Sequence, residues 1–268
     1  MKRFAFFLII LSLLMFACNV STTATPPAAT NPPGITATQP PVATEPPTPQ
    51  VNVTCNELSL YLDPALASGH DCKTIPETGP DSAPFDSAPQ HTELTLQGYP
   101  LVGRFFTPHI SVYPVQRFGE IVPDTVPQRV TALQALIAGG APGDKGLPFL
   151  PVFNAAQEFH AQYSVPAFQS GSGIRFLTQY SQFADPINNH ELFYTFQGLT
   201  SDGKYWISAI LPISTAGLPD TGDNPPNGQT WDQYIASLTA QLNGQDAGSF
   251  APTITALDDL IKSITIQP

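Results

Sequence analysis

The 268-residue chain carries 21 acidic and 10 basic side chains, which gives a formal net charge of −11 at pH 7. A nucleic-acid surface needs clustered basic side chains to neutralise phosphates, and because no such cluster stands out, we expect no nucleic-acid partner. The chain has three cysteines and no His or Cys spacing typical of a metal site, so we expect neither a metal nor a cofactor.

The N-terminus has the layout of a secretory signal peptide. Lys2 and Arg3 precede a run from Phe4 to Ala17 that contains one polar residue, Ser12. As a helix this run would span about 21 Å at roughly 1.5 Å per residue. It is short for a membrane-spanning helix, which needs about 20 apolar residues. We expect residues 1–17 to be a signal peptide that directs export.

Cys18 ends the series Leu14-Met15-Phe16-Ala17-Cys18, which resembles a lipobox. Ala17 is the small residue that a lipobox places before the modified cysteine, whereas Met15 stands where the usual pattern has leucine. We expect Cys18 to carry acyl chains such as palmitate, which anchor the protein to the cell membrane outside the cytoplasm. The alternatives are an ordinary signal peptide or an uncleaved anchor, with Cys18 incidental.

Residues 18–50 are expected to form a disordered stalk. Between Ser21 and Gln50 there are nine prolines and eight threonines, and such a composition cannot bury a core. Repeated proline favours polyproline II, which at about 3.1 Å per residue would hold a domain tens of ångströms from the membrane. Glycosylation of the threonines is an alternative to a plain spacer.

Cys55 and Cys72 are the two cysteines that remain beyond the stalk. An even remainder in an exported chain predicts a disulfide, which would stabilise the fold by about 3 kcal/mol in the chain-entropy model. Two free buried thiols are the alternative. Apart from a short strand at Leu58–Leu62, residues 51–92 are expected to be an irregular surface wrap pinned by this bridge.

Between residues 93 and 138 the spacing of the apolar residues changes, which predicts strands followed by a helix. Alternating apolar residues predict strands around Leu94 and Leu96 and around Ile110 and Val112. The period then becomes helical over residues 127–138, where a proline suits the first turn and a Gly-Gly pair follows the end.

The second half of the chain predicts a meander followed by two helices. Strands are expected over residues 156–168, 174–180, 192–199 and 204–213, with turns at 170–173 and at Asp202-Gly203. Thr230 and Gln233 indicate a capping box at the start of a helix, a second helix begins near residue 252, and a strand covers 263–266. Helices segregated around an antiparallel sheet predict one α+β layered domain over residues 51–268.

Residues 156–266 resemble the PsbP-like family of extrinsic photosystem subunits and their relatives. The resemblance lies in the meander, the strand Tyr205–Ser208 and the final helix that runs into Leu260–Ile264. It implies an α/β/α sandwich and a largely non-catalytic role, namely docking, assembly or some ion or ligand binding at membrane complexes. No metal-binding motif of that family maps onto this chain. The whole domain also resembles exported bacterial lipoproteins with a similar stalk.

The densest polar cluster is Asn188-Asn189-His190-Glu191. His190 with Glu191 has the chemistry to orient a metal or to move a proton. A metal site normally needs three or four ligands, so the alternative is a loop whose Asn and His side chains bond backbone groups.

A second set of polar residues is expected on neighbouring strands, where His160 and Arg175 lie across the Gly-rich turn. We expect Glu158 to pair with Arg175, and the alternative is that Arg175 meets a ligand carboxylate. The turn lacks the Gly-x-Ser-x-Gly order of a nucleophile elbow. Five aromatic residues fit the core and sheet faces better than a sugar-binding platform: Phe193, Tyr194, Phe196, Tyr205 and Trp206.

These features together predict a membrane-tethered, non-catalytic module that binds or supports a partner protein at the membrane surface. One alternative is a hydrolase or metal-dependent enzyme that uses His160, His190 and Glu191. Another is a small-ligand receptor with an aromatic pocket.

Overall fold

The computed structural model describes residues 50–79, 83–143, 146–222 and 228–267. From residue 50 onward these residues fall in a single compact unit. Within the described part the fold is α+β, with four α-helices and one large antiparallel sheet, which confirms the predicted class. The expected signal peptide, Cys18 and nearly all of the stalk lie outside the described residues.

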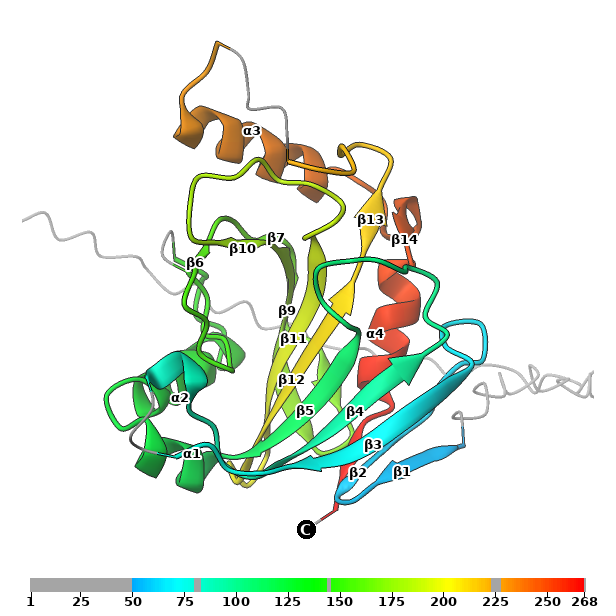
Figure 1. Ribbon diagram of the computed structural model, residues 1–268, viewed down its shortest axis with the longest axis vertical. Coiled ribbons are helices and arrows are strands. Elements are labelled where there is room, and N and C mark those ends of the chain that lie inside the picture. Colours follow the sequence, from blue (N-terminus) through cyan, green and yellow to red (C-terminus); the bar gives the residue numbers. More distant parts are fainter. Residues whose placement is uncertain (1–49, 80–82, 144–145, 223–227, 268) are drawn as a thin grey trace, which may run out of the picture. The chain divides into compact units, whose positions relative to one another are not determined.

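The large sheet has eight strands. Its path is β3-β4-β5-β12-β11-β9-β7, β8 pairs with β9, and every pairing is antiparallel (Figure 1). The strands are β3 (Gly69–Ile75), β4 (His91–Gln97), β5 (His109–Pro114), β7 (Ala161–Ser164), β8 (Ala167–Phe168), β9 (Gly171–Thr178), β11 (Phe193–Thr200) and β12 (Tyr205–Pro212).

The central strands are buried on both faces of this sheet. In β9, Ile174 and Phe176 belong to one apolar cluster and Leu177 to the other, as the alternation of side chains in a strand requires. All eight residues of β11 are buried. A strand covered on both sides has no solvent face, so even the two threonines and the glutamine of β11 are buried with its apolar side chains.

Two helices cover one face of the sheet, at the lower left of Figure 1. They are α1 (Val115–Ile121) and α2 (Val126–Ile137), and the second confirms the helix expected over residues 127–138. Phe118 of α1 and Leu133 of α2 are fully buried in the same cluster as Trp206 of β12. The short α1 was not predicted, because it follows β5 directly and has no side-chain cap at its N-terminus.

The other face packs against α4 (Ile254–Lys262), while α3 (Trp231–Asn243) contacts the β7 edge. The predicted capping box is present: Thr230 Oγ1 accepts from the Gln233 N–H, and the Gln233 side chain accepts from the Thr230 N–H. A small sheet of β1 (Val53–Cys55), β2 (Leu58–Leu60) and β15 (Thr265–Ile266) joins the same apolar cluster. Two short pairs complete the described strands: β6 (Ala156–Gln157) with β10 (Tyr180–Ser181), and β13 (Ser214–Thr215) with β14 (Phe250–Ala251).

The description of residues 51–92 as an irregular wrap was wrong. The segment contains β1, β2 and the edge strand β3, which pairs with β4 over its whole length. No residue of β3 is fully buried, so the strand lacks the apolar alternation by which strands are predicted. The strand expected over residues 156–168 is also divided, into β6, β7 and β8.

The turn expected at residues 170–173 lies slightly earlier, at residues 169–170 between β8 and β9. Gly171 and Gly173 lie inside β9, where they let the backbone approach β11 closely. A Cβ atom on Gly173 would lie 2.4 Å from the Gln197 carbonyl oxygen, and one on Gly171 would lie 2.0 Å from that of Leu199. These glycines therefore mark close backbone packing rather than chain reversal.

Candidate functional site

Asn188 and Asn189 lie in the segment that leads into β11, and both side chains are buried. Asn188 Nδ2 donates to the Pro186 carbonyl at 3.0 Å, and its Oδ1 accepts from the Glu191 N–H at 3.1 Å. Asn189 Nδ2 donates to the carbonyls of Thr215 and Leu218. Both amides are thus engaged with backbone groups, which confirms that alternative for the two asparagines.

His190 and Glu191 are partly buried at the same end of the sheet. The His190 carbonyl accepts from the Phe105 N–H at 2.9 Å, and the two rings meet edge to face with centroids 6.3 Å apart. Burial raises the pKa of Glu191 above its ordinary value, and the nearby Asp185 carboxylate raises it further. The backbone bond and the ring contact of His190 together link the segment before β11 to the loop between β4 and β5.

His160 and Arg175 lie on segments that are paired in the sheet, as predicted. His160 directly precedes β7 and is partly buried, whereas Arg175 in β9 is buried and stands opposite Ser164. The expected pairing of Arg175 with Glu158 was wrong. Arg175 is paired with another carboxylate, that of Asp258, and the Glu158 N–H donates to the Gln179 carbonyl at 3.0 Å.

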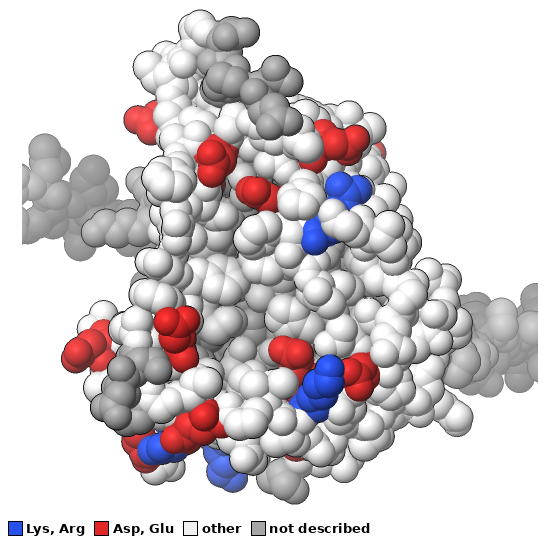
Figure 2. Space-filling view, viewed as in Figure 1, with Lys and Arg blue, Asp and Glu red and all other residues white. Residues whose placement is uncertain are grey.

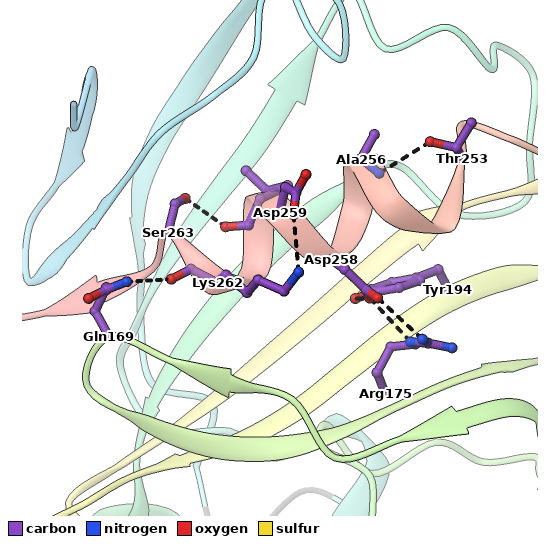
Figure 3. Close-up of polar contacts among 10 residues, drawn as sticks. Gln169, Arg175, Tyr194, Thr253, Ala256, Asp258, Asp259, Lys262 and Ser263 are labelled. Carbon is purple, nitrogen blue, oxygen red and sulfur yellow. Dashed lines mark hydrogen bonds and ion pairs between the residues drawn. The ribbon is translucent and has the colours of Figure 1, made fainter. Parts of the chain in front are cut away.

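Arg175 forms a bidentate ion pair with Asp258 of α4, with both N···O distances at 3.2 Å (Figure 3). The third guanidinium nitrogen donates to the Gln162 carbonyl. The Tyr194 hydroxyl donates to the same carboxylate at 2.8 Å, and burial raises the pKa of this tyrosine well above its ordinary value. All three guanidinium nitrogens are occupied, so this group connects α4 to the sheet instead of facing a ligand.

A buried amide on the opposite face has no motif that marks it in the sequence. Gln197 Oε1 accepts from the Leu150 N–H at 2.9 Å and from Trp206 Nε1 at 2.8 Å. Its Nε2 donates to the hydroxyls of Thr195 and Ser208, each at 2.9 Å. Every hydrogen-bonding site of this amide is satisfied, and the network holds the loop around Leu150 against the sheet.

The aromatic residues of the meander lie in the core, as expected. Phe193, Tyr194, Phe196 and Trp206 are fully buried, and Tyr205 is partly buried and packed against the core. They offer no open platform for a sugar. Large apolar side chains are exposed in other places, with Phe105 62% and Phe183 75% exposed.

A cavity of about 490 Å³ opens beside the first half of α2. Arg129 from α2 lines it, together with Phe149, Gln157 of β6 and Tyr180 of β10. The Arg129 guanidinium donates to the Phe149 carbonyl, and Gln157 Oε1 accepts from the Leu147 N–H. Its residues come from three separate stretches of the chain, and no sequence motif indicated it.

The predicted Cys55–Cys72 disulfide is present and joins β1 to β3, with Cα atoms 5.6 Å apart. Among the described residues, no group of three or more His, Cys, Asp or Glu side chains is placed to hold a metal ion. Within the same residues, no helix has the length and apolar character needed to cross a membrane. No protein-family model, curated protein or solved structure matches this chain significantly.

Proposed function

We propose that this protein is an exported lipoprotein, anchored through Cys18, that works at the membrane surface as a non-catalytic binding or support module for a protein partner. The observation that carries the proposal is the Cys55–Cys72 disulfide. Disulfides persist in oxidising compartments outside the cytoplasm, and this one supports the export that the signal-like N-terminus predicts.

The contacts made by the buried polar side chains also support a binding role. Asn188, Asn189 and Arg175 use their side chains to join segments of the fold. Charged side chains on the face in Figure 2 stand singly or in small groups, without a large basic area. Such a surface suits contact with a protein better than contact with a polyanion.

The end of the sheet near His190 is the surface that we assign to the partner. Val102 and Phe105 of the β4–β5 loop are 86% and 62% exposed, and the Phe105 N–H is bonded to the segment before β11. Exposed aromatic side chains are enriched at protein interfaces because they bury much area at little entropic cost.

Membrane fractionation tests the anchor. Cys18→Ala should release the protein from the membrane fraction into the extracytoplasmic soluble fraction, whereas Cys55→Ser/Cys72→Ser should leave it membrane-bound. Retention in the membrane of a Cys18→Ala variant that has lost residues 1–17 would refute anchoring by lipid.

Site-specific photo-crosslinking in intact cells tests the partner surface. A photoreactive residue at Phe105 should give a discrete crosslinked band that is lost with Cys18→Ala. Phe85, which is 43% exposed and precedes the opposite end of β4, is the matched control and should give no such band. Equal crosslinking at both positions, or none at Phe105, would contradict the assignment.

A further inference from the structure

The cavity beside α2 is separate from the surface assigned to the partner. Its walls come from Thr125, Gln128 and Arg129 at the start of α2, from the segment around Phe149, and from Gln157 and Tyr180. Its volume, about 490 Å³, lies within the range of roughly 300–1,000 Å³ that is typical of small-molecule pockets. It is thus large enough to hold a small ligand.

Arg129 is the positively charged group in this wall, and its guanidinium has unused hydrogen-bonding capacity. Its guanidinium donates to the Phe149 carbonyl, but it forms no ion pair with a carboxylate of the described residues. Arg117 and Arg175, in contrast, are paired with carboxylates. A guanidinium has five N–H donors, so one carbonyl leaves most of them without a protein acceptor.

Burial of Arg129 disfavours the charged form of its guanidinium. Desolvation lowers the pKa of its guanidinium, and the nearby Tyr180 only partly opposes the change. A carboxylate in the cavity would offset the lost hydration, because a planar carboxylate accepts two parallel hydrogen bonds from a guanidinium.

The remaining walls indicate what else the ligand contains. Leu147, Pro148 and Phe149 supply apolar surface, and the buried Gln157 Nε2 has no acceptor in the described structure. The exposed Asp124 carboxylate also lines the cavity and would repel a second negative charge on the ligand.

We propose that this cavity binds a small organic monocarboxylate, with its carboxylate paired to Arg129 and its apolar part against Leu147 and Phe149. This site goes beyond the proposed partner role and does not depend on it. Membrane release by Cys18→Ala would be unaffected if no carboxylate bound.

Calorimetric titration of the purified domain with matched pairs of compounds tests the site. The probes are phenylacetate and benzoate, each compared with its neutral amide. The carboxylates should bind and raise the melting temperature, and the amides should bind at least about ten-fold more weakly. A hydrogen bond to a charged group is stronger than a neutral one by about 1 kcal/mol or more, which corresponds to roughly a ten-fold difference in affinity. Equal affinity for acid and amide, or no binding of either acid up to millimolar concentration, would overturn the proposal.

Two variants and a control locate the binding in this cavity. Arg129→Met should weaken carboxylate binding about ten- to 100-fold. Gln157→Glu retains an oxygen acceptor for the Leu147 N–H but adds a repelling charge, so it keeps the proposal testable if Arg129→Met does not fold. Lys73→Met removes one positive charge from the exposed edge strand β3 and should leave affinity unchanged. Unchanged affinity in Gln157→Glu, or equal losses in all variants, would refute the assignment.

Discussion

Replacement of Asp258 by leucine should destabilise the domain more than replacement of any exposed acidic residue. The Asp258→Leu variant leaves the Arg175 guanidinium with only the Gln162 carbonyl and leaves the buried Tyr194 hydroxyl without its acceptor. Removal of one partner from a buried ion pair costs about 3–5 kcal/mol. The Arg175 and Asp258 side chains are 10% and 19% exposed, so the lower part of that range applies.

We therefore expect Asp258→Leu to lower the free energy of unfolding by about 3 kcal/mol, with about 1 kcal/mol of this from the unpaired tyrosine hydroxyl. In a domain of this size, that loss corresponds to a fall of roughly 6–12 °C in melting temperature. Urea denaturation followed by tryptophan fluorescence gives the free energy, and calorimetry gives the melting temperature.

The neighbouring Asp259 is the matched control. It lies on the same helix, is 65% exposed and pairs with Lys262 at 3.1 Å, so Asp259→Leu should cost less than about 1 kcal/mol. The double variant Arg175→Met/Asp258→Leu removes both charges and should be more stable than Asp258→Leu alone. Equal losses at residues 258 and 259, or a double variant whose loss is the sum of the two single losses, would refute a coupled buried pair.

Three further predictions concern other parts of the domain. Reduction of the Cys55–Cys72 disulfide should lower stability by about 3 kcal/mol, measured by urea denaturation with and without reductant, and an unchanged midpoint would contradict its structural role. Gly173→Ala should lower the melting temperature strongly because its Cβ would lie 2.4 Å from a β11 carbonyl oxygen, whereas Gly248→Ala, with nothing within 4 Å, should be nearly neutral. The pKa of Glu191 is raised in the folded state, so stability is lost as the pH rises from the ordinary carboxyl pKa to this raised value. Glu191→Gln should therefore raise the melting temperature at pH 7 but not at pH 4, and an equal gain at both would argue against titration of this carboxyl group.

Local patterns predicted the central strands and the capping box of α3 well. The alternation around Phe176 and the Thr230 capping box depend on neighbours in the sequence, and both are present. The disulfide followed from the number of cysteines and from the expectation of export, without any knowledge of the fold.

Contacts between distant segments were not predictable in this way. Arg175 and Asp258 are 83 residues apart, and a nearer acidic residue, Glu158, was the only partner that strand spacing suggested. The Gln197–Leu150 bond spans 47 residues and involves a backbone group, which no side-chain pattern reports. The cavity beside Arg129 likewise exists only because α2 and the segment around Phe149 pack together.

The disulfide also determines how the domain bears mechanical load. A pulling force applied at residue 50 enters through β1 and reaches Cys55, from which the covalent bond carries it directly to Cys72 in β3. The backbone between the two cysteines, which includes β2, is thus excluded from the path of tension. β15 pairs with β2, so the last described strand of the chain is shielded as well. After reduction, the tension would instead pass along the backbone beyond Cys55 and into β2.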